Sequence, residues 1–298
     1  MQLAVMENQR SMLKTVGLFA DGIAVKQVGE LNYKICRETL DDVITVTPDE
    51  MCAAIKDIFE ATRCISEPSG AVAVAGMKKY LKAFGKTSDT KNLACVAISS
   101  GANMNFDRLR HIAERAAIGE QKEALFAVTI PEKIGSFRKL CEILGQKNIT
   151  EFNYRYSNSS QNASIFIGVQ IVDGVDRTDL SQLLTANGYD PVDLTNNEMA
   201  KVHLRHIVGG RADDLADERL FRFVFPEKPN ALRAFLDQLG SWNITLFHYR
   251  NHGTDYGRVL VGLNVPADSE EDFSKHLKAL GYLYEEETQN PAYIHFLR

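Results

Sequence analysis

The second half of the sequence contains an internal repeat, and this feature most limits what the chain can fold into. The two copies share a spaced pattern of Leu-Phe, Pro-Glu-Lys, Leu-Gly, Asn-Ile-Thr and Phe-x-Tyr-Arg. A constant spacing of 95 residues separates equivalent positions, from Pro131 and Pro226 to Arg155 and Arg250. A pattern that recurs at a fixed spacing encodes copies of one structural unit. We therefore expect two copies of a small domain, preceded by a separate first region.

Each copy shows the same order of expected elements. Alternating apolar residues and turn residues predict a strand, a helix, two hairpin-connected strands and a second helix in both copies, with a final short strand near 192–194 in the first. This βαββαβ order is the ferredoxin-like arrangement, and two copies can pair about a pseudo-twofold axis. The expected boundaries are 123–196 for the first copy and 218–298 for the second. Residues 197–217 form the expected bridge, with a helix from about Glu198 to Ile207.

The first region, residues 1–117, has a different pattern. Thr47-Pro-Asp-Glu50 predicts a helix N-terminus, because a threonine cap and a glutamate three residues later form a capping box. The apolar runs 43–46 and 93–98 predict strands, the second buried on both faces of a parallel sheet. This is α/β architecture, in which ligands bind beyond the strand ends, where Ser99 to Asn103 would lie. A tight turn that needs a glycine explains the same residues without a ligand.

The repeated Phe-x-Tyr-Arg motif is the candidate binding motif. In a regular strand Phe152 and Tyr154 share one face, and Arg155 lies on the other. An arginine can bind a carboxylate through two hydrogen bonds, and a tyrosine offers an apolar wall with a hydroxyl group. Together they suit a free amino acid. Core aromatic residues beside a surface arginine explain the pattern equally well.

Composition excludes several classes of function. The net charge is −5, which gives no basic surface for nucleic acid. No apolar run approaches the roughly 20 residues that span a membrane. The five cysteines are odd in number and form no Cys-x-x-Cys pair, which indicates reduced thiols in a cytoplasmic protein and no metal site.

Longer segments of the sequence resemble one known family, biosynthetic threonine dehydratase (threonine deaminase), a pyridoxal-phosphate enzyme. Segments similar to the end of its catalytic domain are Leu18-Phe-Ala-Asp-Gly-Ile-Ala-Val25, Glu67-Pro-Ser-Gly-Ala71 and Ser100-Gly-Ala-Asn103. Segments similar to its regulatory part are Asp193-Leu-Thr-Asn-Asn-Glu-Met-Ala-Lys201, Gly209-Gly-Arg211 and His248-Tyr-Arg-Asn-His-Gly-Thr-Asp-Tyr-Gly-Arg258. The resemblance covers nearly the whole chain. It implies an α/β fragment of a fold-type II (tryptophan synthase β-like) domain, followed by two ACT-like subdomains.

The resemblance also implies a function. The family converts L-threonine to 2-oxobutanoate and ammonia, the first step of isoleucine synthesis; L-isoleucine inhibits the reaction and L-valine opposes this inhibition. It further implies a homo-oligomer, a tetramer in the family. By position, the implied effector contacts are Tyr154, Arg155, Arg205, Tyr249 and Arg250.

One residue corresponds to a cofactor contact of the family. Ser100 matches the residue that hydrogen-bonds the pyridine nitrogen of pyridoxal phosphate. A neutral hydroxyl leaves that nitrogen unprotonated and the ring a weaker electron sink, which favours β-elimination over transamination.

Two elements of the family pattern have no counterpart in this sequence. These are the lysine that holds the cofactor covalently, in a Ser-x-Lys-x-Arg-Gly-Ala setting, and the glycine-rich loop for its phosphate. We therefore expect no catalytic residue here, and a fragment, a truncated gene product or one half of a split enzyme. Two alternatives follow: a dehydratase whose catalysis belongs to a longer or complemented protein, or a non-catalytic amino-acid-sensing module.

We predict that the 298-residue chain alone neither attaches pyridoxal phosphate covalently nor deaminates threonine. The reason is that the chemistry needs the Schiff-base lysine. The measurement is 2-oxobutanoate formation from L-threonine and added cofactor. Product above the protein-free blank would contradict the prediction.

Overall fold

The chain forms two compact units, Met1–Glu120 and Gln121–Arg298. The computed structural model describes residues 1–84, 93–155, 162–206, 215, 217–226, 231–240, 242–250 and 256–297. Each unit has its own hydrophobic core. The functional residues are therefore considered separately for the two units.

The first unit is helical in its described part. Its elements are α1 (Gln2–Met6), the short 3₁₀ helix η1 (Asp21–Ile23), α2 (Glu30–Thr39), α3 (Pro48–Thr62), α4 (Pro68–Phe84) and α5 (Phe106–Gly119). The predicted capping box at Thr47 is confirmed: its hydroxyl accepts from Glu50 N at 3.2 Å, and Glu50 Oε2 accepts from Thr47 N at 2.7 Å. Helices α3, α4 and α5 enclose the core, whose buried residues are Met51, Cys52, Ala54, Ile55, Ala71, Ala75, Ile112 and Ala116.

The two strands predicted in the first unit are wrong as strands. Residues 43–46 and 93–98 have no regular structure, and no described residue pairs with them in a sheet. Val96 is 93% exposed and Ile98 is 73% exposed, where a strand buried on both faces was expected. An apolar run becomes a strand only if neighbouring strands accept its backbone hydrogen bonds. The described part of this unit supplies none.

The second unit contains two copies of the predicted βαββαβ order. The first copy comprises β1 (Glu123–Pro131), α6 (Ser136–Leu144), β2 (Ile149–Arg155), β3 (Asn162–Gln170), α7 (Gly174–Ala186) and β4 (Pro191–Asp193). The second comprises β5 (Glu218–Pro226), α9 (Ala231–Leu239), β6 (Asn243–Arg250), β7 (Tyr256–Asn264), α10 (Glu270–Ala279) and β8 (Leu283–Glu286), with the 3₁₀ helix η3 (Ala267–Ser269) before α10. The strands join in one sheet of order β4-β1-β3-β2-β6-β7-β5-β8.

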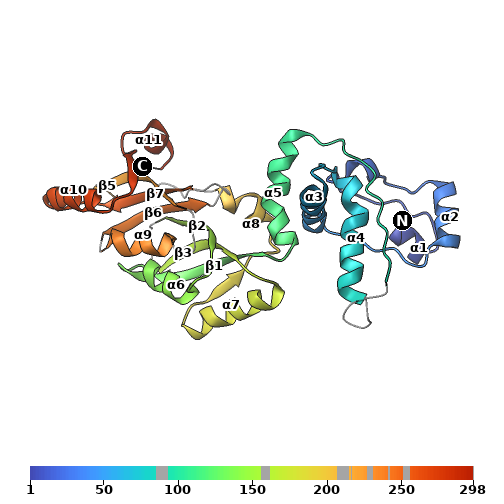
Figure 1. The fold of residues 1–298 in the computed structure, drawn as a ribbon, viewed down its shortest axis with the longest axis horizontal. Coiled ribbons are helices and arrows are strands. Elements are labelled where there is room, and N and C mark those ends of the chain that lie inside the picture. The colour runs from blue at the N-terminus through green and yellow to red at the C-terminus, as the bar shows by residue number, and fades with distance from the viewer. Residues whose placement is uncertain are drawn as a thin grey trace. The chain divides into compact units, whose positions relative to one another are not determined.

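Helices cover both faces of this sheet, but unequally (Figure 1). Residues of α6, α7, α9 and α10 pack with the strands into one core that is continuous across both copies. The opposite face, called the outer face below, carries only short helices in the part of the unit that the structure describes. These are α8 (Glu198–Val202) with the 3₁₀ helix η2 (Leu204–His206), and α11 (Pro291–Phe296), which the sequence analysis had not placed.

The two copies meet through the antiparallel pairing of β2 with β6. The Cα partners are Glu151–Arg250, Phe152–Tyr249, Asn153–His248, Tyr154–Phe247 and Arg155–Leu246. Asn153 and His248 are equivalent positions of the two copies and lie opposite each other. The copies thus pair about a pseudo-twofold axis, as the repeat predicted, and the axis passes through the repeated motif itself.

Both copies carry the same irregularity next to the junction. The strand register shifts at Thr150 in β2 and at the equivalent Thr245 in β6. Each neighbouring strand supplies a glycine there: a Cβ on Gly168 would lie 2.5 Å from Thr150 Oγ1, and one on Gly262 would lie 2.8 Å from Thr245 Oγ1. Glycine is needed at both positions because the strands approach so closely.

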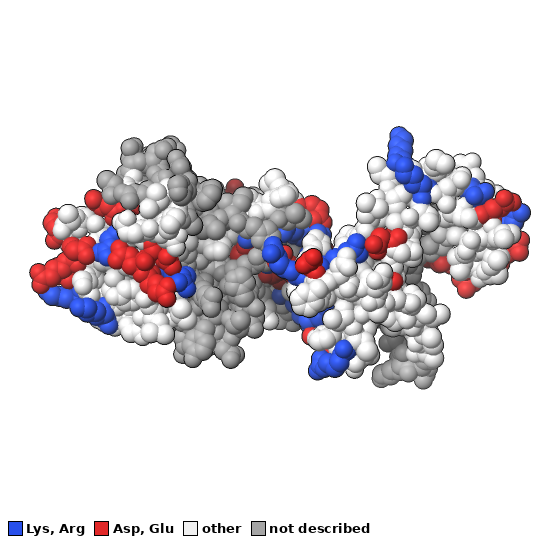
Figure 2. Space-filling view, turned by 90° about the horizontal axis from the view of Figure 1, so that it is seen from above, with Lys and Arg blue, Asp and Glu red and all other residues white. Residues whose placement is uncertain are grey.

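Charged side chains protect the exposed edge strand β8. Arg219 of β5 pairs with Glu286 at 2.6 Å, and Arg222 pairs with Glu287 at 2.9 Å. Figure 2 shows acidic and basic side chains gathered at this end of the unit. Charges on an edge strand oppose the addition of a strand from another chain.

The aromatic packing across the junction can be tested by a double-mutant cycle. Phe152 and Phe247 meet edge to face with ring centroids 5.5 Å apart. We expect Phe152→Leu and Phe247→Leu each to lower the free energy of unfolding by about 0.5 to 3 kcal/mol. Because the rings contact each other, the two losses should couple by about 0.5 to 1.5 kcal/mol.

The control cycle pairs Phe152→Leu with Phe273→Leu, since Phe273 packs on Phe221 and Trp242 instead. That pair should be additive within about 0.5 kcal/mol in urea unfolding. Equal coupling in the two cycles would contradict a specific contact at the junction.

Candidate effector and cofactor sites

The junction strands place the tyrosine and the arginine of each motif on opposite faces. Tyr154 and Tyr249 are 3% and 2% exposed and belong to the core under the long helices. Arg155 points to the outer face, where Glu151 and Asn153 are also buried. The alternation follows from regular strand geometry. Tyr154 and Arg155 therefore do not converge on one ligand.

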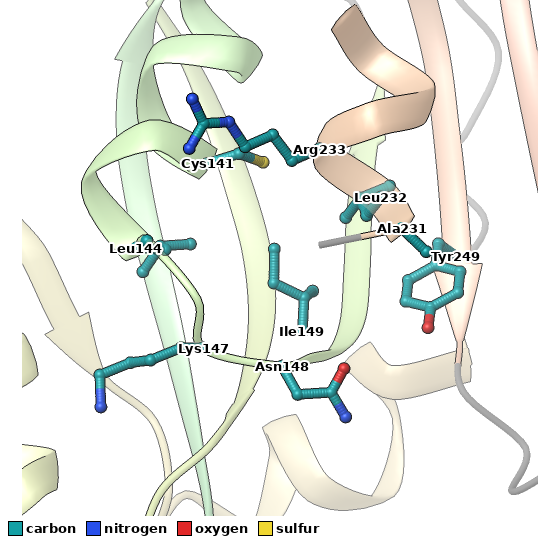
Figure 3. A pocket seen from close by; sticks show the side chains of 10 residues that line it. Cys141, Leu144, Lys147, Asn148, Ile149, Ala231, Leu232, Arg233 and Tyr249 are labelled. Atoms are coloured by element: carbon teal, nitrogen blue, oxygen red, sulfur yellow. The ribbon is translucent and has the colours of Figure 1, made fainter. Parts of the chain in front are cut away.

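A small pocket lies beside Tyr249, between the two copies of the repeat (Figure 3). The loop from α6 to β2 forms one side, and the start of α9 forms the other. Its lining residues are Cys141, Leu144, Gly145, Lys147, Asn148, Ile149, Ala231, Leu232, Arg233 and Tyr249. Gly145 allows the loop its turn, since its φ of 65° lies in the left-handed region.

The pocket combines an apolar floor with a polar rim. Leu144, Ile149 and Leu232 are apolar, and burial raises the pKa of the Cys141 thiol to about 12, which keeps it neutral. At the rim, Lys147 pairs with Asp176 at 2.5 Å. The cavity measures about 20 Å³, enough for roughly one water molecule. An amino acid can enter only if lining side chains move apart.

The equivalent position in the first copy is closed by an aromatic ring. Phe137 packs edge-on against Tyr154 at a centroid distance of 4.6 Å, where the other copy has the smaller Leu232. The Tyr154 hydroxyl donates to Glu132 Oε1. The two tyrosines thus have equivalent places but different surroundings.

Arg155 forms a buried ion pair that crosses from the first copy to the second. Its guanidinium contacts the Glu218 carboxylate at 2.5 and 3.1 Å and donates to the Leu297 carbonyl at 2.7 Å. Tyr293 of α11 donates to the same carboxylate at 2.5 Å, and the Thr245 hydroxyl donates to it as well. These contacts engage Arg155 within the protein.

Arg205 forms the corresponding network in the first copy. Its Nε donates to Glu151 Oε2 at 2.7 Å and its Nη2 to Glu123 Oε1 at 2.9 Å, while Thr150 donates to Glu123 at 2.6 Å. Burial alone lowers the pKa of this guanidinium, but the two carboxylates outweigh it and the pKa is raised. The side chain of Arg250 lies outside the described residues; its backbone pairs with Glu151.

The sequence carried a signal for these networks that the repeat analysis missed. Glu123 and Glu218 are equivalent at the spacing of 95 residues, as are Thr150 and Thr245, which the repeated Asn-Ile-Thr pattern already contains. The tails repeat too, at a spacing of 93, as Thr-x-Asn followed by Leu-Arg. The equivalent tail segments are 195–205 and 288–298.

The structure confirms that the two tails are used alike. Thr195 Oγ1 accepts from Leu125 N at 3.0 Å, and Thr288 Oγ1 accepts from Leu220 N at 3.0 Å. Helix α8, expected in a bridge, therefore belongs with the outer face of the first copy, as α11 does with the second.

Ser100 lies in the first unit, exposed on the segment before α5. The next residue is held tightly: the Gly101 carbonyl accepts from Glu67 N and from Ser66 Oγ, both at 3.0 Å. A Cβ on Gly70 would lie 2.7 Å from Gly101 N, so glycine is needed at position 70 for this approach. Ser69, in the adjoining turn of α4, has a buried hydroxyl without a partner among the described residues.

These residues fit one edge of pyridoxal phosphate. The backbone is fixed at Gly101, next to Ser100, and a serine hydroxyl is a group that can hydrogen-bond a pyridine nitrogen. The orphaned Ser69 hydroxyl nearby is suited to a further polar contact.

Comparison with known families decides the relationship. The model of the C-terminal regulatory domain of threonine dehydratase matches residues 114–204 and 209–297, one match for each copy with its tail. The chain belongs to the threonine dehydratase family. A model of pyridoxal-phosphate dependent enzymes matches residues 2–98. The fold class is thus a fragment of a pyridoxal-phosphate domain followed by two ACT-like regulatory domains.

Curated threonine dehydratases match along the whole chain. L-threonine dehydratase biosynthetic IlvA of Burkholderia multivorans is 52% identical over 298 residues, which is 100% of this chain and 58% of the relative. The Escherichia coli protein of the same name is 51% identical over 96% of this chain and 55% of its own length. Threonine dehydratase, mitochondrial, of Saccharomyces cerevisiae is 46% identical over 99% of this chain and 53% of its own length. The chain spans somewhat more than half the length of these relatives.

Among the described residues, no helix is long and apolar enough to cross a bilayer.

The charge network of the outer face predicts a large effect of Arg205. We expect Arg205→Met to lower the free energy of unfolding by about 3 to 5 kcal/mol, because Glu123 and Glu151 lose a buried cation. Urea unfolding measures this loss.

The control for this variant is Arg138→Met in the same unit. Arg138 is exposed on α6 and forms a solvent-exposed ion pair with Glu142 at 3.6 Å. Because exposed ion pairs contribute little, its loss should change the free energy of unfolding by no more than about 0.5 kcal/mol. A loss below about 1 kcal/mol for Arg205→Met would show that the network carries little energy.

Proposed function

We propose that the second unit is the amino-acid-sensing regulatory part of a threonine dehydratase. The pocket beside Tyr249 is the observation that carries this proposal. A loop of the first copy and a strand and helix of the second line it together. A ligand there contacts both copies at their junction, so its binding free energy can change how they pack against each other.

The chemistry of the pocket suits an aliphatic amino acid. Leu144, Ile149 and Leu232 form a floor for a branched side chain (Figure 3). At the rim, Arg233 is held only loosely by Asp237, at 3.9 Å, and is available for an α-carboxylate. We propose L-isoleucine as the inhibitor and L-valine as its antagonist.

This proposal assigns the predicted effector residues two different roles. Tyr249 contacts the ligand directly. Tyr154 contacts a ligand at the equivalent place in the first copy, which Phe137 closes in this structure, once that ring moves aside. Arg155 and Arg205 hold the outer face through Glu218, Glu123 and Glu151. They position the strands whose other face carries the tyrosines. Effector contact by Arg250 stays a prediction.

The activity that this part regulates is the conversion of L-threonine to 2-oxobutanoate and ammonia. Pyridoxal phosphate, when bound, supplies the electron sink for β-elimination. Ser100 would hold the pyridine ring by a hydrogen bond from its hydroxyl and, because this group is neutral, would leave the ring nitrogen unprotonated. We place the reaction in a cytoplasmic homo-oligomer.

Isothermal titration of the chain with L-isoleucine tests the regulatory proposal. We expect heat of binding in the wild type and an affinity lowered roughly 10-fold or more in Tyr249→Phe, which removes a hydroxyl group from the pocket. L-valine and L-threonine serve as comparison ligands.

The matched control is Tyr284→Phe on β8, three strands away from β6, which should leave the affinity unchanged. Absence of heat with all three amino acids would contradict a working effector site in this chain. An unchanged affinity in Tyr249→Phe would place the ligand elsewhere.

A further inference from the structure

Glu132 lies beside the candidate effector residues and has no charge partner among the described residues. It follows directly after β1, and its Oε1 accepts the hydroxyl hydrogen bond of Tyr154. Its Oε2 is buried and has no hydrogen-bond partner among the described residues. It is the only carboxylate oxygen among the buried, unpartnered side-chain atoms of that part of the chain.

The fully buried carboxylates in the described part of the second unit are each matched by an arginine. Glu218 has Arg155, and Glu123 and Glu151 share Arg205. No ion pair of the described residues includes Glu132. Burial raises the pKa of its carboxyl group, and the hydrogen bond from Tyr154 offsets only part of this. A desolvated carboxylate with a free oxygen gains most from a cation that reaches it.

The position of Glu132 relates it to the pocket of the other copy. Tyr154 is the equivalent of Tyr249, which lines that pocket. Trp242, the only tryptophan of the chain, is likewise the equivalent of Lys147 at the rim. Glu132 therefore lies where a ligand of the first copy would present its polar end.

We infer that Glu132 binds the α-ammonium group of an amino-acid effector, while the hydroxyl of Tyr154 holds the Glu132 carboxylate in place. This inference rests on the regulatory function proposed above and names the group that recognises the ligand as an amino acid. An ammonium group donates to Oε2 and neutralises the charge, which no keto or hydroxy acid can do. Glu132 thus selects for the amine, whatever the side chain.

The inference predicts a distinction between L-isoleucine and 3-methyl-2-oxopentanoate, which has the same side chain and carboxylate but no amine. In the wild type, the keto acid should bind roughly 10- to 100-fold more weakly, the value of one charge-assisted hydrogen bond. Glu132→Gln should lower the affinity for L-isoleucine by a similar factor and leave the affinity for the keto acid unchanged. Calorimetry gives the affinities. A change in Trp242 fluorescence would report binding beside Tyr154, because Trp242 is the repeat equivalent of the rim residue Lys147.

The matched control is Glu142→Gln, an equal loss of charge at an exposed position of α6. It should bind both ligands as the wild type does. The wild-type comparison of the two ligands needs no variant and holds even if Glu132→Gln folds poorly.

Two failures can be told apart. If L-isoleucine binds and Tyr249→Phe weakens it, but Glu132→Gln does not and the keto acid binds equally well, the inference about Glu132 is overturned and the regulatory function stands. If no amino acid gives heat or a fluorescence change in the wild type, the proposed function falls and the inference falls with it.

Discussion

The antiparallel pairing of β2 with β6 is the interaction on which the second unit depends. It joins two four-stranded halves into one sheet and brings equivalent residues of the repeat face to face. Because side chains alternate along a strand, the register of β2 against β6 determines which side chains lie on each face of the sheet. Phe152, Tyr154, Phe247 and Tyr249 enter the core, while Glu151 and Arg155 enter the outer face.

The two faces have different physical characters. Under the long helices, close-packed aromatic rings leave little space, and the small pocket at Tyr249 exists where Leu232 replaces the larger Phe137. On the outer face, buried carboxylates and arginines are satisfied by short helices that bring Tyr293 and Arg205 to them. A ligand that shifts β2 against β6 on one face must therefore also disturb the ion pairs on the other.

The fold of the second unit was predictable from the sequence because its information is local and repeated. The spacing of 95 residues predicted two βαββαβ copies, and the Phe-x-Tyr pattern predicted which side chains share a face. The prediction of strands at 43–46 and 93–98 was wrong because strand formation depends on distant partners, which an apolar run cannot reveal. Strand β8 and helix α11 of the second copy correspond to β4 and α8 of the first. Their spacing is 93 residues instead of 95, so the constant spacing did not reveal them.

The candidate site was predictable only in part. The tyrosines could be placed by strand alternation, but the partners of the arginines could not. Glu218 lies 63 residues from Arg155, and Glu151 lies 54 residues from Arg205. Glutamates are mostly exposed, so nothing in the local sequence marked these as buried. The comparisons identified the family, but only the geometry separated the residue that lines the pocket, Tyr249, from arginines held in buried ion pairs.

The origin of the two arginines sets an order in the making of the protein. The first copy neutralises Glu123 and Glu151 with Arg205 from its own tail, whereas Glu218 of the second copy takes Arg155 from the first. A ribosome completes the first copy before the second begins to emerge, and domains fold as they are made. The earlier copy can therefore fold with its own counter-charge and offer β2 as a template. The later copy acquires its buried arginine only by docking onto a partner that is already present.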